Sequence, residues 1–180
     1  MNNLLPTALV ALVGIGAIDW ALTPAYAPPK EAPPAAESHA PAHPEARPFD
    51  AHADAMAAVD AALARASRRG THVLLVMGAN WCHDSRGLAG LFETPDMASL
   101  IEEHFELVYV DAGRPREEDV HNLHVARRFG VERLEGTPNL FILSAEGELL
   151  NPPEDVIGWT DAASRDPGDI RDFLLAHRLR

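Results

Sequence analysis

Apolar residues recur along the chain at two spacings, and the change from one to the other predicts where helices and strands lie. Compact apolar runs at residues 72–77 and 107–110 are typical of buried strands. Residues 50–69 and 82–92 carry apolar residues at helical spacing instead, and Gly70 ends the first of these helices. Helices and strands are therefore expected to alternate along the chain.

The middle of the chain adds two further helical signals. Thr94 followed by Pro95 is typical of an N-cap and a first helical residue, so a kink or a new helix is expected there. A further helix is predicted over residues 117–129, with Gly130 as the residue that ends it. These signals continue the alternation of helix and strand.

The C-terminal part of the chain combines a hairpin with a last helix. Residues 139–144 and 148–150 are predicted as two short strands joined by a tight turn over 145–148. Asp166 followed by Pro167 opens the final helix. Strands that alternate with helices and then form a hairpin imply an α/β fold, with a mixed central sheet and helices on both of its faces.

The first residues of the chain have the pattern of an export segment. Their apolar stretch, from Leu4 to Ile18, has about 15 residues, which suits a signal peptide and is short for a membrane span. Ala25-Tyr26-Ala27 supplies a cleavage site, but no Lys or Arg precedes the apolar stretch and Pro28 would follow the cut. We therefore expect a signal peptide or an N-terminal membrane anchor over residues 1–27. Either places the domain in the periplasm or otherwise outside the cytoplasm; the alternative is an apolar N-terminus on a cytoplasmic protein.

Proline and alanine dominate residues 28–49, which are expected to form an extended linker before a domain over residues 50–180. His39 and His43 lie in this linker, and His52 lies just beyond it. A polar spacer explains these histidines more simply than a metal-binding tract does.

Charge and cysteine content exclude several classes of function. The net charge is −12, so we expect no nucleic-acid partner and no basic patch for a membrane surface. Cys82 is the only cysteine, which excludes an internal disulfide and a cysteine-based zinc site. Redox chemistry with a thiol of another molecule remains open.

Cys82 lies where a predicted strand passes into a predicted helix. A helix N-terminus presents free N–H groups and the positive end of the dipole, so it favours a thiolate over a thiol. Ser85 lies on the same helix face at i+3, and its hydroxyl is expected to stabilise the thiolate. Arg86 at i+4 and a protonated His83 would act in the same direction, whereas Asp84 would oppose them. The sequence thus predicts that the fold activates this thiol.

The segment Trp81-Cys82-His83-Asp84-Ser85 resembles the Trp-Cys-x-x-Cys active site of thioredoxin-like proteins, with serine in place of the second cysteine. Downstream, Phe129-Gly130-Val131 and then residues 136–143 resemble the second landmark of that family, where a cis-proline faces the active-site cysteine. The resemblance covers roughly residues 50–180. It implies a thioredoxin-like three-layer sandwich, with helices on both faces of a mixed central sheet.

The resemblance also implies roles for individual residues. Cys82 and Ser85 would form the catalytic pair. Thr137 would offer its backbone N–H and C=O groups to a bound peptide, and the bond before Pro138 would be cis. Trp81 and His83 would complete the substrate-binding surface.

Two departures from the family pattern point to a mechanism with one cysteine. Ser85 cannot resolve a mixed disulfide, so an outside thiol must release Cys82. Val76 stands where the family usually has a buried acid that serves the second cysteine. We therefore predict thiol–disulfide exchange in cell redox homeostasis, with thiol- or disulfide-containing proteins or glutathione as partners and with no cofactor. Loss of redox activity would explain the same departures.

Two other classes of function compete with this hypothesis. The domain could be a non-catalytic module that binds peptides or assists folding through the same groove. Metal delivery through the histidines between residues 39 and 52 is a further alternative. We predict no metal at Cys82 and His83, or at His121 and His124, because neither pair has further ligands at a suitable spacing.

Overall fold

The computed structural model describes residues 43–114 and 121–179. The predicted signal peptide or anchor and most of the predicted linker, including His39, lie outside this range. No helix in the described part of the chain is long and apolar enough to cross a membrane.

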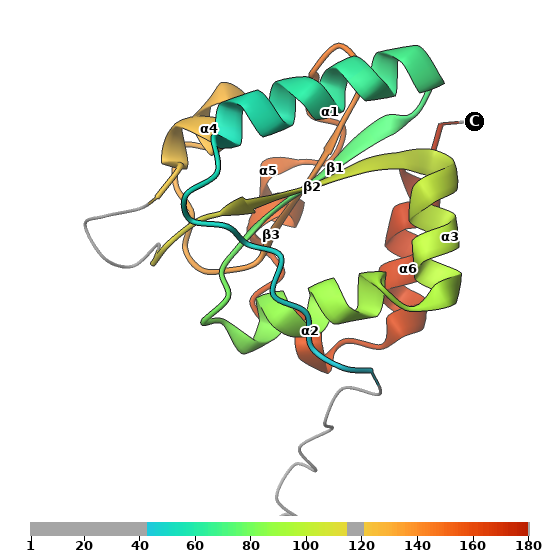
Figure 1. Ribbon diagram of the computed structural model, residues 1–180. Coiled ribbons are helices and arrows are strands. Elements are labelled where there is room, and N and C mark those ends of the chain that lie inside the picture. Colours follow the sequence, from blue (N-terminus) through green and yellow to red (C-terminus); the bar gives the residue numbers. More distant parts are fainter. Residues whose placement is uncertain (1–42, 115–120, 180) are drawn as a thin grey trace, which may run out of the picture. The chain divides into compact units, whose positions relative to one another are not determined.

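A mixed sheet of three strands forms the centre of the fold (Figure 1). The strands are β1 (His72–Gly78), β2 (Phe105–Asp111) and β3 (Asn139–Leu143), in the order β2-β1-β3. β1 is parallel to β2 and antiparallel to β3. Gly78 pairs with Asp111, and Met77 pairs with Asn139. The end of β1 therefore lies between the end of β2 and the start of β3.

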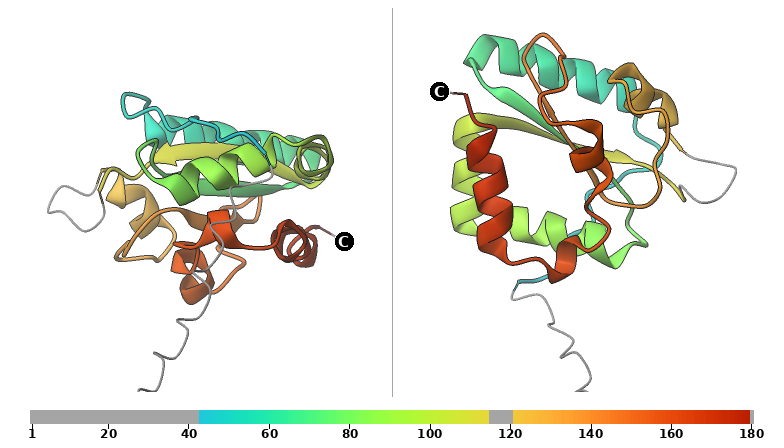
Figure 2. Two further views of the ribbon diagram at one scale, coloured as in Figure 1. Left: turned by 90° about the horizontal axis from the view of Figure 1, so that it is seen from below. Right: turned by 180° about the vertical axis from the view of Figure 1, so that it is seen from behind.

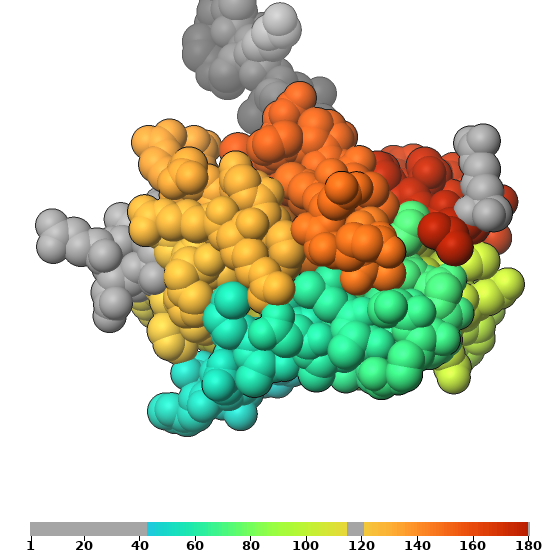
Figure 3. Space-filling view, turned by 90° about the horizontal axis from the view of Figure 1, so that it is seen from above, coloured from blue at the N-terminus to red at the C-terminus, as the bar shows by residue number. Residues whose placement is uncertain are grey.

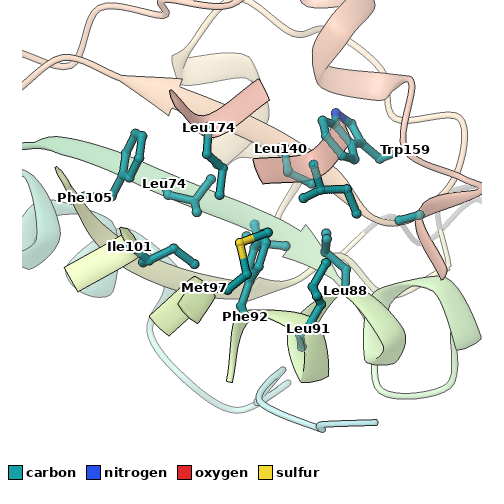
Figure 4. Packing of buried hydrophobic residues seen from close by; sticks show 14 of the residues in the cluster. Leu74, Leu88, Leu91, Phe92, Met97, Ile101, Phe105, Leu140, Trp159 and Leu174 are labelled. Carbon is teal, nitrogen blue, oxygen red and sulfur yellow. The ribbon is translucent and has the colours of Figure 1, made fainter. Parts of the chain in front are cut away.

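One face of the sheet is covered by three helices, two of which lie between β1 and β2 in the chain and the third near its C-terminus. They are α2 (His83–Phe92), α3 (Pro95–His104) and α6 (Pro167–Ala176). Their apolar residues pack on Leu74, Phe105 and Leu140 of the three strands (Figure 4). α3 and α6 lie side by side at one end of this layer (Figure 2).

The opposite face is covered by the other three α-helices of the described chain. They are α1 (Ala55–Arg69), α4 (Leu123–Arg128) and α5 (Pro153–Ile157). Val73, Leu75 and Met77 point to this side, because successive residues of a strand face opposite sides of a sheet. The turn after β3 adjoins α1 on the surface (Figure 3), with Gly147 close to Leu63. The predicted α/β sandwich with a mixed sheet is thus confirmed.

A capping residue defines the start of α1, and two predicted helix boundaries are confirmed. Asp54 caps α1 by accepting a hydrogen bond from Ala57 N, 3.0 Å away. Thr94 is the N-cap of α3, and Pro95 is its first residue. Gly130, with φ of 81°, follows the end of α4 in the left-handed conformation that glycine adopts easily.

The helix predicted over residues 117–129 is shorter than expected. Residues 115–120 lie outside the described chain, and α4 begins only at Leu123. Asn122 has φ of 57° and donates a side-chain hydrogen bond to Asp111 O, 2.9 Å away, so the regular helix cannot include it. His121 therefore precedes α4, and the prediction that it shares a helix with His124 is wrong.

The hairpin after β3 is also shorter than predicted. The return segment makes a single bridge, between Leu143 and Leu149, instead of a strand. The buried side chain of Asn151 takes the place of further pairing, since its amide accepts from Ile142 N at 2.8 Å and donates to Leu140 O at 3.0 Å. The loop beyond it holds α5 and a 3₁₀ turn, η1 (Ala162–Ser164), neither of which the sequence pattern indicated.

Residues 43–49 pack against the fold although the sequence assigned them to the linker. We call this segment the strap; it runs beside α2 (Figure 1). Ala46 and Phe49 are buried, and the Phe49 ring meets Tyr109 edge-on with 5.3 Å between centroids. The packed chain therefore begins before residue 50.

Candidate functional site

Cys82 is the N-cap of α2, directly after the turn that leaves β1. Its backbone is extended, with φ of −83° and ψ of 125°. Its N–H donates to Ala79 O at 3.1 Å, and its carbonyl accepts from Arg86 N at 3.1 Å. This position places the sulfur at the start of a ten-residue helix, where the N–H groups of the first turn lack partners within the helix.

The sulfur of Cys82 contacts the segment that precedes β3. Its thiol donates a hydrogen bond to Thr137 O, 3.3 Å away, and the residue is 8% exposed. The peptide bond between Thr137 and Pro138 is cis. Two segments that the sequence singled out, 55 residues apart, therefore meet at the sulfur.

Ser85 does not make the predicted hydrogen bond to the sulfur of Cys82. Its side chain is fully buried, and its hydroxyl has no hydrogen-bond partner among the described residues. The hydroxyl points beneath the helix toward Gly78, where an added Cβ would lie 2.9 Å from it. The expected hydrogen bond from Ser85 to Cys82 is thus absent in this thiol form.

His83 and Arg86 are turned toward the strap, where both bind Glu45. Glu45 Oε1 lies 2.6 Å from His83 Nδ1, and Oε2 lies 2.6 Å from Arg86 Nε. The hydrogen bond from Arg86, and then the one from His83, lowers the pKa of Glu45 below its ordinary value. Arg86, which the sequence predicted to favour the thiolate, is thus paired with a carboxylate that offsets part of its charge.

Trp81 is the most exposed aromatic residue beside the sulfur, at 49% exposure. Its indole N–H donates to Gly113 O at 2.9 Å, and the Arg114 guanidinium lies 4.8 Å from the ring centroid. This cation–π contact and the hydrogen bond fix the ring against the loop after β2. Trp81 thus presents an apolar surface to solvent next to Cys82.

Asp84 and Asn139, which the sequence analysis did not place in the site, hold its framework. Asp84 accepts a hydrogen bond from Ala163 N at 3.0 Å, which ties α2 to η1. The buried amide of Asn139 donates to Gly136 O at 2.8 Å and to Met77 O at 3.3 Å. It therefore fixes the segment that carries Thr137 against the end of β1. An Asn after a proline gave no signal of this, because both acceptors are backbone atoms.

Two further polar residues, Asn80 and Asp111, stabilise the turns around Cys82. The Asn80 amide donates to Phe49 O at 2.7 Å and accepts from Phe49 N at 3.2 Å. The buried carboxylate of Asp111 accepts from Gly113 N at 2.9 Å and from His121 Nδ1 at 3.1 Å. His121 therefore has a packing role at the loop that supports Trp81.

No group of three or more His, Cys, Asp or Glu side chains within residues 43–114 and 121–179 is arranged to hold a metal ion. The chemistry that the site offers is that of a single thiol. It combines a sulfur at a helix N-terminus, a backbone carbonyl that accepts a hydrogen bond from the thiol, and an exposed aromatic surface beside it.

Comparisons with known proteins match the region that contains this site. The family model described as Thioredoxin-like matches residues 54–145. The chain is also similar to a disulphide isomerase from Xylella fastidiosa Temecula1, whose crystal structure is known. The two share 30% sequence identity and superpose with a TM-score of 0.65, and the match covers 73% of this chain and 96% of that chain. No curated protein matches.

Proposed function

The chain belongs to the thioredoxin-like family, and from this premise we propose that it performs thiol–disulfide exchange with Cys82 as its single nucleophile. The observation that carries the proposal is the meeting of Cys82 with Thr137. The sulfur lies at the N-terminus of α2 and, at 3.3 Å, against the carbonyl that precedes the cis bond to Pro138.

This contact couples the ionisation of the thiol to the availability of the carbonyl. A thiol can donate to Thr137 O, but a thiolate has no proton to donate and is repelled by the oxygen. Ionisation of Cys82 therefore frees Thr137 O to accept a hydrogen bond from the backbone of a partner. Trp81 and His83 flank the sulfur and would contact the same partner.

The proposed reaction begins when the Cys82 thiolate attacks one sulfur of a partner disulfide. A bond forms between Cys82 and that sulfur, and the other sulfur leaves as a thiolate with the bonding electron pair. The product is a mixed disulfide between Cys82 and the partner. Ser85 cannot attack it, because a hydroxyl does not exchange with a disulfide.

A second thiolate must therefore attack the mixed disulfide and release Cys82. When this thiolate comes from the partner itself, the partner's disulfides are rearranged with no net oxidation or reduction. This mode needs neither a second cysteine in the chain nor an external reductant. Because the solved relative is described as a disulphide isomerase, we favour isomerisation, with glutathione as another source of the releasing thiol.

The buried hydroxyl of Ser85 supports a second part of the proposal. A buried hydroxyl without a partner costs free energy, on the order of 1–3 kcal/mol. We propose that it donates to the sulfur once Cys82 is ionised, which would stabilise the thiolate. We also propose that the chain acts outside the cytoplasm, released or tethered by residues 1–27, since disulfides persist in oxidising compartments.

The experiment that tests the function uses the full chain and a protein whose disulfides have been scrambled. Wild type is expected to restore the native pairing, and Cys82→Ser is expected to restore none beyond the uncatalysed rate. Cys82→Ser should keep the fold, since serine is smaller and can donate to Thr137 O. Equal recovery with the two proteins would contradict the proposal.

The alternative function is a peptide-binding or folding-assistance module without catalysis. The observation that favours it is the contrast between Cys82, which is only 8% exposed, and Trp81, which is 49% exposed. In that case wild type would bind unfolded peptides without rearranging their disulfides, and Cys82→Ser would bind them equally well.

A further inference from the structure

The strap carries one carboxylate that contacts both basic side chains of the first turns of α2. Besides its two contacts of 2.6 Å with His83 and Arg86, Glu45 accepts a longer hydrogen bond of 3.4 Å from Arg86 Nη2. The carboxylate thus spans a histidine and an arginine that follow Cys82 by one and four residues.

Backbone contacts fix the place of Glu45 on the helix. The next residue, Ala46, donates its N–H to Arg86 O at 3.1 Å. Arg47 Nη1 donates to Asn80 O at 2.8 Å. Together with the buried Phe49, these contacts hold the strap on both sides of the turn that carries Cys82.

Arg86 is itself part of that turn. Its N–H donates to Cys82 O at 3.1 Å, and its Nη1 donates to Asn80 O at 3.2 Å. Its side chain is only 16% exposed, so solvent screens its charge less than that of a free surface arginine. The charge balance between Arg86 and Glu45 therefore acts close to the cysteine.

We propose that Glu45 is a positioning residue for Cys82: it holds Arg86 and His83 against the strap and offsets the positive charge of Arg86, and of His83 when it is protonated, so that they stabilise the thiolate only in part. A carboxylate near a thiolate disfavours the anion, and a guanidinium paired with a carboxylate presents less net charge. Glu45 thereby limits the fraction of Cys82 that is ionised near neutral pH. The significance of this control rests on the exchange chemistry proposed above.

Other charged residues on the segments next to the site in the chain stay unchanged when Glu45 is replaced. They belong to the strap, to α2, to the loops on either side of Trp81 and to the segment before Thr137. These side chains are Arg47, Asp84, Asp111, Arg114, His121, Glu132, Arg133 and Glu135. Because they are common to all the variants below, a difference between variants reports on the cluster at Glu45.

The test measures the rate of Cys82 alkylation by a neutral reagent, iodoacetamide, against pH on the full chain. Glu45→Gln removes the charge and keeps the size of the side chain. The midpoint of the rate profile is expected to fall by about 0.5 pH unit relative to wild type. The shift is expected to shrink at about 0.5 M salt, because salt screens charges and would not restore a displaced strap.

Two further variants distinguish charge from structure. Asp60→Asn removes a carboxylate that lies 2.6 Å from Arg128 on the other face of the sheet, and it should leave the midpoint unchanged. Glu45→Asp keeps the charge with a shorter reach, and its midpoint should stay within about 0.2 unit of wild type. An equal shift in either control variant would overturn the proposal, as would an unshifted midpoint in a Glu45→Gln protein with a native circular dichroism spectrum.

The same data separate this inference from the proposed function. A wild-type midpoint at or above about 8.5, the value of a free thiol, would contradict activated exchange at Cys82. The difference between wild type and Glu45→Gln would still decide the role of Glu45.

Discussion

At the scale of single residues, the site is organised by what each side chain does to one sulfur. Thr137 O accepts a hydrogen bond from the thiol, Glu45 offsets the charge of Arg86, and the Ser85 hydroxyl lies buried without a hydrogen-bond partner among the described residues. These contacts are those of a buried thiol that donates a hydrogen bond. Ionisation of Cys82 would break this hydrogen bond and leave Thr137 O without it.

Ser85→Cys tests whether position 85 still faces Cys82. The added thiol is expected to form a disulfide with Cys82 under mild oxidation, because the two positions share the first turn of α2. Mass spectrometry should show a loss of about 2 Da and no free thiol, and Ser85→Ala should keep one free thiol. Two free thiols that persist after oxidation would show that the side chains do not meet.

At the scale of elements, the strap and α2 form one unit. Gly90 on α2 allows this contact, because an added Cβ there would overlap the carbonyl oxygen of Pro44. The strap therefore packs against the outer side of the helix whose first turn carries the site. Its sequence, rich in proline and alanine, gave no indication of this, since its hydrogen-bond partners outside the strap lie 31 to 41 residues away along the chain.

Gly90→Ala tests the contact between the strap and α2 through the sign of its effect on the free energy of unfolding. Replacing glycine by alanine inside a free helix stabilises it by about 1 kcal/mol. Here the overlap with Pro44 is expected to reverse the sign and lower the free energy of unfolding by about 1–3 kcal/mol. Urea denaturation of wild type and variant measures the difference. An unchanged or more stable variant would show that the strap does not pack on α2.

At the scale of the whole molecule, a buried carboxylate links the stability of the fold to pH. Burial of Glu106 opposes its ionisation, but hydrogen bonds from Arg65 at 2.7 Å and Arg69 at 2.5 Å outweigh it and lower the pKa below 4.5. This contribution to stability is present above pH 4.5 and is lost as the pH falls through the lowered pKa. These two ion pairs of Glu106 with Arg65 and Arg69 also connect α1 to β2.

Glu106→Gln is therefore expected to cost about 1–3 kcal/mol of unfolding free energy at pH 7. The difference from wild type should shrink below pH 4.5, because wild type then loses the same charge. Urea denaturation at the two pH values measures both differences. A difference that stays constant as the pH falls would contradict this role for Glu106.

Much of the fold could be predicted from local sequence patterns. The rest could not, because it depends on contacts between residues that are distant in the sequence. The apolar run before Gly78 and the cap at Thr94 specify β1 and α3 through neighbours in the sequence. Asn151 and Glu45 contact residues that only the fold brings near. Asn151 accepts a hydrogen bond from Ile142 of β3, and Glu45 offsets the charge of Arg86 on α2. The length of the hairpin and the charge of the site both depended on such contacts.

Activation of Cys82 by the fold is tested most directly by the reaction of Cys82 with a small aromatic disulfide, followed by absorbance of the released thiolate. It compares the folded full chain with the same chain unfolded in urea at about pH 6.5. If the fold lowers the ionisation midpoint by about one unit, the thiolate fraction rises about tenfold while its nucleophilicity falls about threefold. The folded chain is therefore predicted to react about three times faster than the unfolded chain. A folded chain that reacts more slowly than the unfolded one would show that Cys82 is a buried structural thiol.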